Sequence, residues 1–216
     1  MWSVCSKQRD IPMKRIAGLL MIVLFACHAF GQSIDQSNVP AVVLNAFQLK
    51  FPNASNVKWK LQKGEYRVEF KVNSKAHKLT LNDKGGLLRL SQDLYVSEIP
   101  ETVLATIRSK VSYFDVHDAD RWEEEGAITY QISFKVDGKN HLFRINEKGI
   151  LLKYRKELKD SEVPESIMNL IQTIYGPYDI DNAKYVEEPG KTIYILRGEI
   201  HDYFHAFTFD EKTTIL

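Results

Sequence analysis

Three histidines at a fixed spacing from three tyrosines are the side chains of this sequence best suited to chemistry. Each histidine follows its tyrosine by eleven residues, in the pairs Tyr66 and His77, Tyr130 and His141, and Tyr194 and His205. Imidazole can serve as a general base or a metal ligand. A catalytic site, however, needs different groups that converge on one point, whereas a repeat places identical groups at separate points. We therefore expect no enzyme, and histidines that lie partly buried at a sheet margin, hydrogen-bonded to the backbone or to a neighbouring hydroxyl.

Two other groupings could hold a metal ion. His201 and His205 have the spacing of zinc ligands on a helix, but they flank a hairpin turn and should point to opposite faces. The stretch 115–125 (DVHDADRWEEE) could offer carboxylates to calcium, yet it lacks the alternating acidic residues and the glycine of an EF-hand loop. We expect a solvated acidic turn and no cofactor, with calcium binding as the alternative.

Residues 1–31 have the pattern of an export signal. Met13, Lys14 and Arg15 give a basic start, 16–27 is apolar, and 29–31 (AFG) offers a cleavage site of small residues. The apolar run has twelve residues, which is too short for a bilayer that needs about 20. A signal that begins at Met13 fits this pattern better than one that begins at Met1. We expect a periplasmic protein, with a lipid tether at Cys27 as the alternative.

Cysteine content and charge narrow the class of protein. Both cysteines, Cys5 and Cys27, lie in the signal, so the exported chain has no disulfide and no thiol nucleophile. Removing the four basic residues and the one acidic residue of 1–31 leaves 25 basic and 27 acidic residues, a net charge of −2. That balance argues against nucleic acid, which needs a clustered positive footprint. It also predicts no attraction to an anionic membrane, and the exported chain has no transmembrane candidate.

One unit of sequence occurs three times, at 39–97, 98–160 and 161–216. Each copy has a proline near its start, Pro40, Pro100 or Pro164, followed by apolar residues at helical spacing. The expected buried stripes are Val43, Phe47 and Phe51, then Val103, Ile107 and Val111, then Ile167, Ile171 and Ile174.

Alternating strands follow each expected helix. The first carries an aromatic residue, Trp59, Trp122 or Tyr185, which we expect to be buried between sheet and helix. A Tyr/His hairpin comes next, and then an Asp/Glu-Lys turn and a last strand. The pattern predicts an α+β fold of tandem repeats, each a helix packed on an antiparallel sheet of about four strands. The third copy is degenerate, with a truncated last strand.

This arrangement resembles the PepSY-like family of exported bacterial proteins. The motif is "VP..V…F…FP", a tryptophan strand, "Y.VEF" and "DKGGLL", and the likeness covers nearly all of 39–216. The resemblance implies a fold like that of the β-lactamase inhibitor protein and a non-catalytic periplasmic role. It also implies binding or inhibition of other envelope proteins, and an origin in Bacteroidetes-type bacteria. A calcium- or small-ligand-responsive periplasmic sensor is the alternative function.

The third copy is the expected contact surface for an unknown envelope protein. In the first two copies the sheet face away from the helix is polar, whereas the third copy places apolar and aromatic residues there or at the hairpin tip. These are Val186, Ile195, Tyr203, Phe204 and Ala206. Exposed aliphatic and aromatic groups commonly mark interaction sites, but the same residues could pack inside the molecule or against a second copy.

Overall fold

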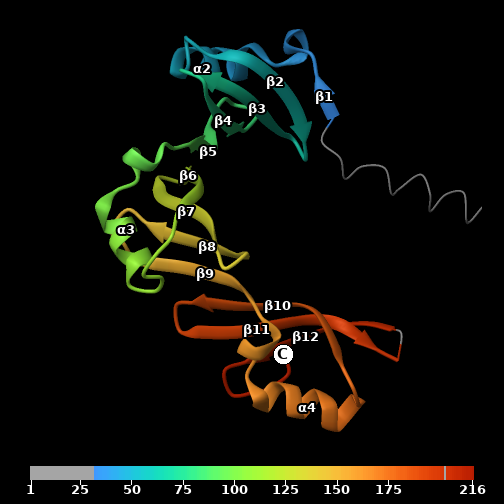
Figure 1. Cartoon of the computed structure of the whole chain (residues 1–216). Helices are drawn as coiled ribbons and strands as arrows, with labels where there is room; N and C mark the ends of the chain where they lie inside the picture. The colour runs from blue at the N-terminus through green and yellow to red at the C-terminus, as the bar shows by residue number, and fades with distance from the viewer. Residues whose placement is uncertain (1–31, 202) are drawn as a thin grey trace, which may run out of the picture.

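The structure, a computed structural model, describes residues 32–201 and 203–216 (Figure 1). The expected export signal at 1–31, including Cys27, lies outside these residues. None of the helices in the described part of the chain combines the length and the apolar character that crossing a bilayer requires.

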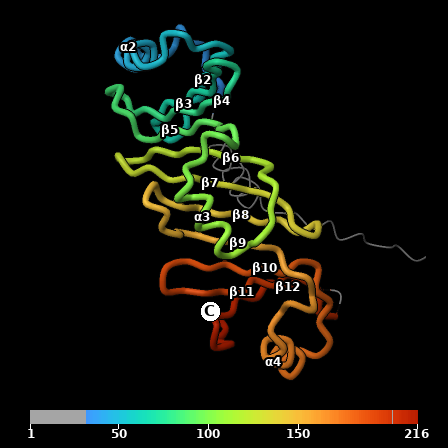
Figure 2. The backbone as a smooth tube through the Cα atoms, turned by 60° about the vertical axis from the view of Figure 1, so that its left-hand side comes forward, coloured from blue at the N-terminus to red at the C-terminus, as the bar shows by residue number. Residues whose placement is uncertain are grey.

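Within the described residues, twelve strands form one antiparallel sheet in which each strand pairs with the next along the chain. Figure 2 shows them following one another through the length of the molecule. The strands are β1 (Gln32–Ile34), β2 (Ser55–Gln62), β3 (Glu65–Val72), β4 (Lys75–Leu81), β5 (Leu87–Asp93), β6 (Val116–Glu124), β7 (Ala127–Val136), β8 (Lys139–Asn146), β9 (Leu151–Leu158), β10 (Asp179–Glu188), β11 (Lys191–Ile200) and β12 (Tyr203–Asp210).

The described residues also form three α-helices, each after a short 3-10 helix. The α-helices are α2 (Ala41–Lys50), α3 (Glu101–Arg108) and α4 (Glu165–Tyr175), and the 3-10 helices are η2 (Gln36–Asn38), η3 (Val96–Glu98) and η4 (Asp160–Glu162). Pro40, Pro100 and Pro164 are the N-cap residues of the α-helices. A proline is tolerated at a helix start because the first backbone N–H groups of a helix have no partner within it.

The expectation of tandem units, each with its own sheet of about four strands, is wrong. β5 pairs with β6, with Ser91 opposite Trp122, and β9 pairs with β10, with Leu158 opposite Ala183. The sheet is therefore continuous across both expected boundaries. Separate sheets would each leave two strand edges with unpaired N–H and C=O groups, and pairing across the boundaries satisfies those groups. The division at 39–97, 98–160 and 161–216 stays a prediction.

The hydrophobic core consists of three clusters, and each contains two buried residues of one helix. They are Val43 and Phe47 in α2, Val103 and Ile107 in α3, and Ile167 and Ile171 in α4. Residues four apart lie on one side of a helix, which explains the pairs. The third residue of each expected stripe is less buried, because Phe51 and Val111 follow their helices and Ile174 is 52% exposed.

The three helices cover the same face of the sheet. Leu90 of the first cluster pairs with Glu123, which is on the face of Ala119 in the second cluster. Tyr154 of the second cluster likewise pairs with Glu187, on the face of Ala183 in the third. Paired residues point to the same side, and so do residues two apart in a strand. We call the opposite side, which no α-helix of the described chain covers, the helix-free face.

The aromatic residues of the first strands differ in where they point. Trp59 is 2% exposed and packs edge-on against Phe47, with 5.2 Å between ring centres, which confirms the expected burial. Trp122 contradicts the expected burial between sheet and helix, because this residue lies on the helix-free face, opposite Ser91 and Thr129. Trp59 lies four residues before the turn residue Lys63, and Trp122 lies three before Glu125. A difference of one residue reverses the face.

Tyr185 lies on the helix-covered face but is only partly buried. Its ring lies between those of Tyr154 and Tyr194, with 5.9 and 5.6 Å between ring centres. In the third hairpin Ala183 pairs with Leu196, and this pair is equivalent to Trp59 and Val68 in the first hairpin. The third hairpin therefore places a small residue where the first places tryptophan.

Candidate functional site

The Tyr/His pattern is part of the scaffold. His77 and His141 are buried, and their Nδ1 atoms lie 3.1 Å from the carbonyl oxygen of Lys75 and 3.0 Å from the hydroxyl of Tyr154. Each ring stacks on a phenylalanine of the same hairpin, Phe70 or Phe134, with 5.2 and 5.4 Å between centres. Burial lowers the pKa of His141, and Lys156 lowers it further. The prediction of buried, hydrogen-bonded histidines is confirmed for these two.

The third histidine is more exposed. His205 is partly buried and stacks on Phe207 with 6.0 Å between ring centres. His201, its expected partner for zinc, is exposed and has a positive φ of 49° at the end of β11. In residues 32–201 and 203–216, no three His, Cys, Asp or Glu side chains are placed to hold a metal ion together.

The acidic stretch 115–125 is a strand rather than a turn over most of its length. β6 takes up Val116–Glu124, and Asp120 pairs with Asp93 of β5 on the helix-free face, while Asp118 lies two residues away on the same side. Burial raises the pKa of Asp120 to about 6, and the neighbouring carboxylates of Asp118 and Asp93 add to the rise. Calcium binding at 115–125 stays a prediction.

The helix-free face is the described side of the sheet that no α-helix covers, and most of its residues are polar. Some of its charges form ion pairs, such as Lys60 with Glu69 at 2.9 Å and Lys153 with Glu188 at 2.7 Å. Several cations on this face have no ion pair among the described residues: Lys58, Lys71, Lys78, Lys135, Arg144, Arg155 and Lys184. They lie on both sides of the carboxylates of Asp93, Asp118 and Asp120. The face therefore has two positive regions separated by a negative one.

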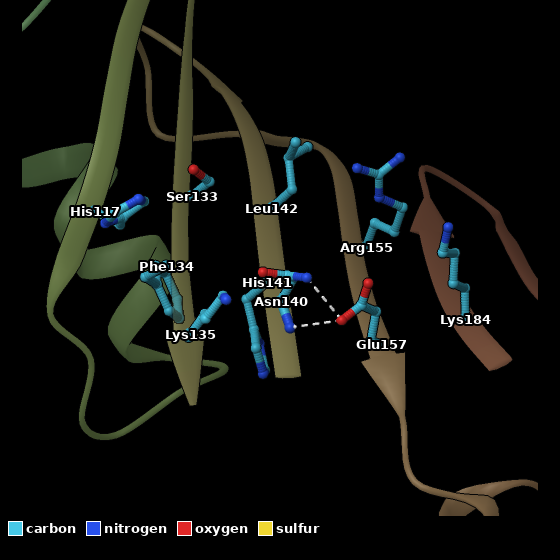
Figure 3. A pocket seen from close by; sticks show the side chains of 10 residues that line it. All are labelled: His117, Ser133, Phe134, Lys135, Asn140, His141, Leu142, Arg155, Glu157 and Lys184. Atoms are coloured by element: carbon cyan, nitrogen blue, oxygen red, sulfur yellow. Dashed lines mark hydrogen bonds between the residues drawn. The ribbon is translucent and has the colours of Figure 1, made fainter. Parts of the chain in front are cut away.

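A hollow of about 240 Å³ opens on this face over β7, β8, β9 and β10 (Figure 3), and we call it the central hollow. Its lining comes from alternate residues of these strands and from the exposed His117 of β6. The residues are His117, Ser133, Phe134, Lys135, Asn140, His141, Leu142, Arg155, Glu157 and Lys184. Phe134 and His141 point to the other face and belong to the core.

The strand register fixes the order of these side chains. Lys135 pairs with Asn140 across the hairpin, and Ser133 pairs with Leu142, which in turn pairs with Arg155. The turn at Asp137 and Gly138 has φ of 49° and 76°, as tight hairpins require, and glycine adopts such angles without strain. A turn of any other length would change which residues face each other.

One carboxylate lies inside the central hollow. Glu157 accepts hydrogen bonds from the side chain and the backbone N–H of Asn140, at 2.8 and 3.1 Å. These bonds hold the pKa of Glu157 below its ordinary value, and the nearby Lys184 and Lys139 lower it further. Glu157 is therefore ionised at neutral pH. The three cations and this one carboxylate give the hollow a net charge of +2.

A second hollow lies at the matching place of the first hairpin. It is lined by Asn56, Val57, Lys58, Glu69, Phe70, Lys71, Ala76, His77 and Lys78. Lys71 pairs with Ala76 as Lys135 pairs with Asn140. In the third hairpin the same pair is Glu199 and Phe204, so the cation is replaced by an acid.

The residues expected to form the partner surface do not all come together. Val186 lies on the helix-free face but is 3% exposed, between Arg155 and Ile193 of the neighbouring strands, so it is not part of an exposed surface. Ile195 is partly buried, whereas Ala206 and Phe204 are exposed on that face, Phe204 by 70%. Tyr203 is 74% exposed but points to the other side, since it is one residue from Phe204. Binding by these residues stays a prediction.

Sequence reasoning missed the central hollow. The sequence predicts a polar sheet face in the second copy, but it did not connect Lys135 with Arg155, Glu157 and Lys184 on that face. A signal was available, because the two-residue turn at 137–138 fixes the pairing of Lys135 with Asn140. The neighbour on β10, Lys184, could not be inferred while each unit was expected to have a sheet of its own, because β10 belongs to the third copy.

Comparisons with known proteins give a likeness in fold only. No protein-family model matches the chain, and no curated protein matches it. Among solved structures, a DUF2874 family protein from Bacteroides ovatus is 23% identical, with a TM-score of 0.48, over 54% of this chain and 86% of that protein. A BLIP-like protein from Bacteroides fragilis is 18% identical, with a TM-score of 0.47, over 58% and 93%. A protein described as a periplasmic candidate from Bacteroides eggerthii is 17% identical, with a TM-score of 0.49, over 55% and 88%. The resemblance to PepSY-like proteins stays a prediction.

Proposed function

We propose that this chain is an exported, non-catalytic protein that binds another protein through its helix-free face. The observation that carries the proposal is that one face of a twelve-stranded sheet has no α-helix over it and presents charged side chains without ion pairs among the described residues. A sheet face of this size with unpaired cations favours a macromolecular partner, because complementary charges steer association and fix the register of an interface.

The absence of catalysis in this proposal rests on the histidines. His77 and His141 are the repeated groups best suited to proton transfer, and both are held by structural contacts within the core. Export and a periplasmic location rest on residues 1–31, and a lipid tether at Cys27 is the alternative form of export. Inhibition is one consequence that binding could have, and an activity assay on an identified partner tests it.

Photocrosslinking in the cell envelope tests the proposal. A photoreactive phenylalanine replaces Lys135 or Arg197, which are exposed on the helix-free face, or Leu49 or Lys148, which are exposed elsewhere. We expect the first two positions to crosslink the same protein, which mass spectrometry identifies, and the other two to give none of it. If only Leu49 and Lys148 gave crosslinks, the contact would lie outside the helix-free face and the proposal would be wrong.

A further inference from the structure

The central hollow has the composition of a site for a carboxylate. Lys135, Arg155 and Lys184 are among its lining residues, and none of them forms an ion pair with a described residue. The carboxylate already present, Glu157, is engaged by the two N–H donors of Asn140. Neither Lys135 nor Arg155 has an acidic partner within ion-pair distance among the described residues.

The lining of the hollow favours a side chain rather than a bare ion. Leu142 lies between Ser133 and Arg155 in the register, and its apolar surface is partly exposed to the hollow. A glutamate side chain has apolar methylene groups next to its carboxylate, so it fits a lining that combines Leu142 with three cations. Arginine can hold such a carboxylate with two parallel hydrogen bonds.

The repeat supports an extended ligand. The hollow of the first hairpin has unpaired Lys58, Lys71 and Lys78 at its rim, at the matching place on the same face. A ligand that uses several such sites of one sheet face is a protein surface rather than a small anion. The third hairpin, with Glu199 at this place, has no equivalent cation.

We propose that the central hollow binds glutamate or aspartate side chains from an acidic segment of the partner protein. This inference rests on the proposed function and names the chemistry of the partner at that same face. The segment lies across β7, β8, β9 and β10, with a carboxylate between Lys135, Arg155 and Lys184. Its negative charge is complementary to the net charge of +2 in the hollow.

The test compares two triple variants with equal changes in charge. The hollow variant is Lys135→Gln, Arg155→Gln, Lys184→Gln, and the control variant is Lys50→Gln, Lys84→Gln, Lys148→Gln, whose lysines are all exposed and outside the hollow. The probes are a short fluorescein-labelled peptide rich in glutamate, the same peptide with glutamine in place of glutamate, and inorganic phosphate. Fluorescence anisotropy measures affinity, and circular dichroism checks that each variant is folded.

We expect the glutamate peptide to bind the unaltered chain and the hollow variant to weaken this binding by about tenfold, while the control variant leaves it unchanged. The glutamine peptide should not bind. If the hollow variant is unstable, Lys135→Gln alone, at an exposed position, should still weaken binding by about threefold.

Four results would overturn the inference. They are equal losses in both triple variants, no binding of the glutamate peptide by the unaltered chain, equal binding of the glutamine peptide, and displacement of the peptide by phosphate at similar concentration, which indicates a small-anion site. Failure of the proposed function is a separate outcome. If Arg197 still crosslinks its partner in the hollow variant, the hollow is not the docking site but the helix-free face is; if the unaltered chain crosslinks nothing, the proposed function itself fails.

Discussion

The Nδ1 atom of His141 lies 3.0 Å from the hydroxyl of Tyr154, and both side chains are buried. The contact joins β8 to β9 inside the core, because His141 pairs with Lys156 and Phe143 with Tyr154. It gives the second of the three repeated histidines a structural role, as the carbonyl oxygen of Lys75 does for His77. The imidazole has a fixed structural partner.

The Tyr154→Phe variant should be less stable by about 1–3 kcal/mol, because it leaves the buried Nδ1 atom of His141 without a partner. His141→Gln should cost a similar amount and leave partner binding intact. Urea unfolding measures both, and Tyr113→Phe, at an exposed tyrosine, is the control. Loss of binding at unchanged stability in His141→Gln would show that the histidine belongs to a functional site.

Trp59→Ala and Trp122→Ala should differ in cost although both remove an indole. Trp59 is buried against Phe47, so its loss should cost about 3–5 kcal/mol. Trp122 is partly exposed on the helix-free face, in a hollow beside Arg67 and Arg89, so its loss should cost about 1 kcal/mol. Equal costs in chemical unfolding would place both rings in equivalent packing and contradict the register described for β6.

Asp120→Asn should stabilise the chain at pH 7. The pKa of Asp120 is raised to about 6 in the folded chain, against about 3.9 when unfolded, so the folded state binds protons more tightly. Stability from this group is present below about pH 4 and is lost as pH rises through 6. The carboxyl is partly exposed, so the gain at pH 7 should be on the order of 1 kcal/mol.

The pH dependence distinguishes this cause from others. The stability difference between Asp120→Asn and the unaltered chain should vanish below about pH 4, where both side chains are neutral. Asp83→Asn, at an exposed aspartate in a turn, is the control for the loss of one negative charge. A constant advantage from pH 4 to pH 8 would mean that ionisation of Asp120 is not the reason.

Phe204→Ser should leave folding nearly unchanged, within about 0.5 kcal/mol, because the ring is 70% exposed. If this end of the helix-free face belongs to the partner surface, crosslinking from Arg197 should fall. Val186→Ala should instead lower the stability of the fold, since Val186 is buried. A large loss of stability in Phe204→Ser would instead mean that the ring packs within the molecule.

The sequence predicts local features well and their connection poorly. The helix starts at Pro40, Pro100 and Pro164 and the buried pairs, such as Val43 with Phe47, follow from spacing alone. The pairing of β5 with β6 does not follow from spacing, because contacts between strands far apart in sequence depend on the whole sheet. Trp122 shows the limit: its neighbours resemble those of Trp59, yet one residue of register turned it to the other face.

The candidate site was less predictable than the fold. Lys135 and Arg155 lie in the second sequence copy and Lys184 lies in the third, and only the continuous sheet brings Lys184 beside the other two. Apolar residues of the third copy were a clearer signal in the sequence, yet Val186 is buried by its neighbours. Exposure of a strand residue depends on the long side chains beside it, here Arg155.

Lysine footprinting of the crosslinked complex is the most direct test of the helix-free face as the binding surface. The chain is acetylated with and without its partner, and mass spectrometry measures the modification of each lysine. We predict protection of Lys58, Lys71 and Lys135, which are exposed on the helix-free face, and no protection of Lys50, Lys84 and Lys148. Protection of the second set with continued modification of the first would contradict the account.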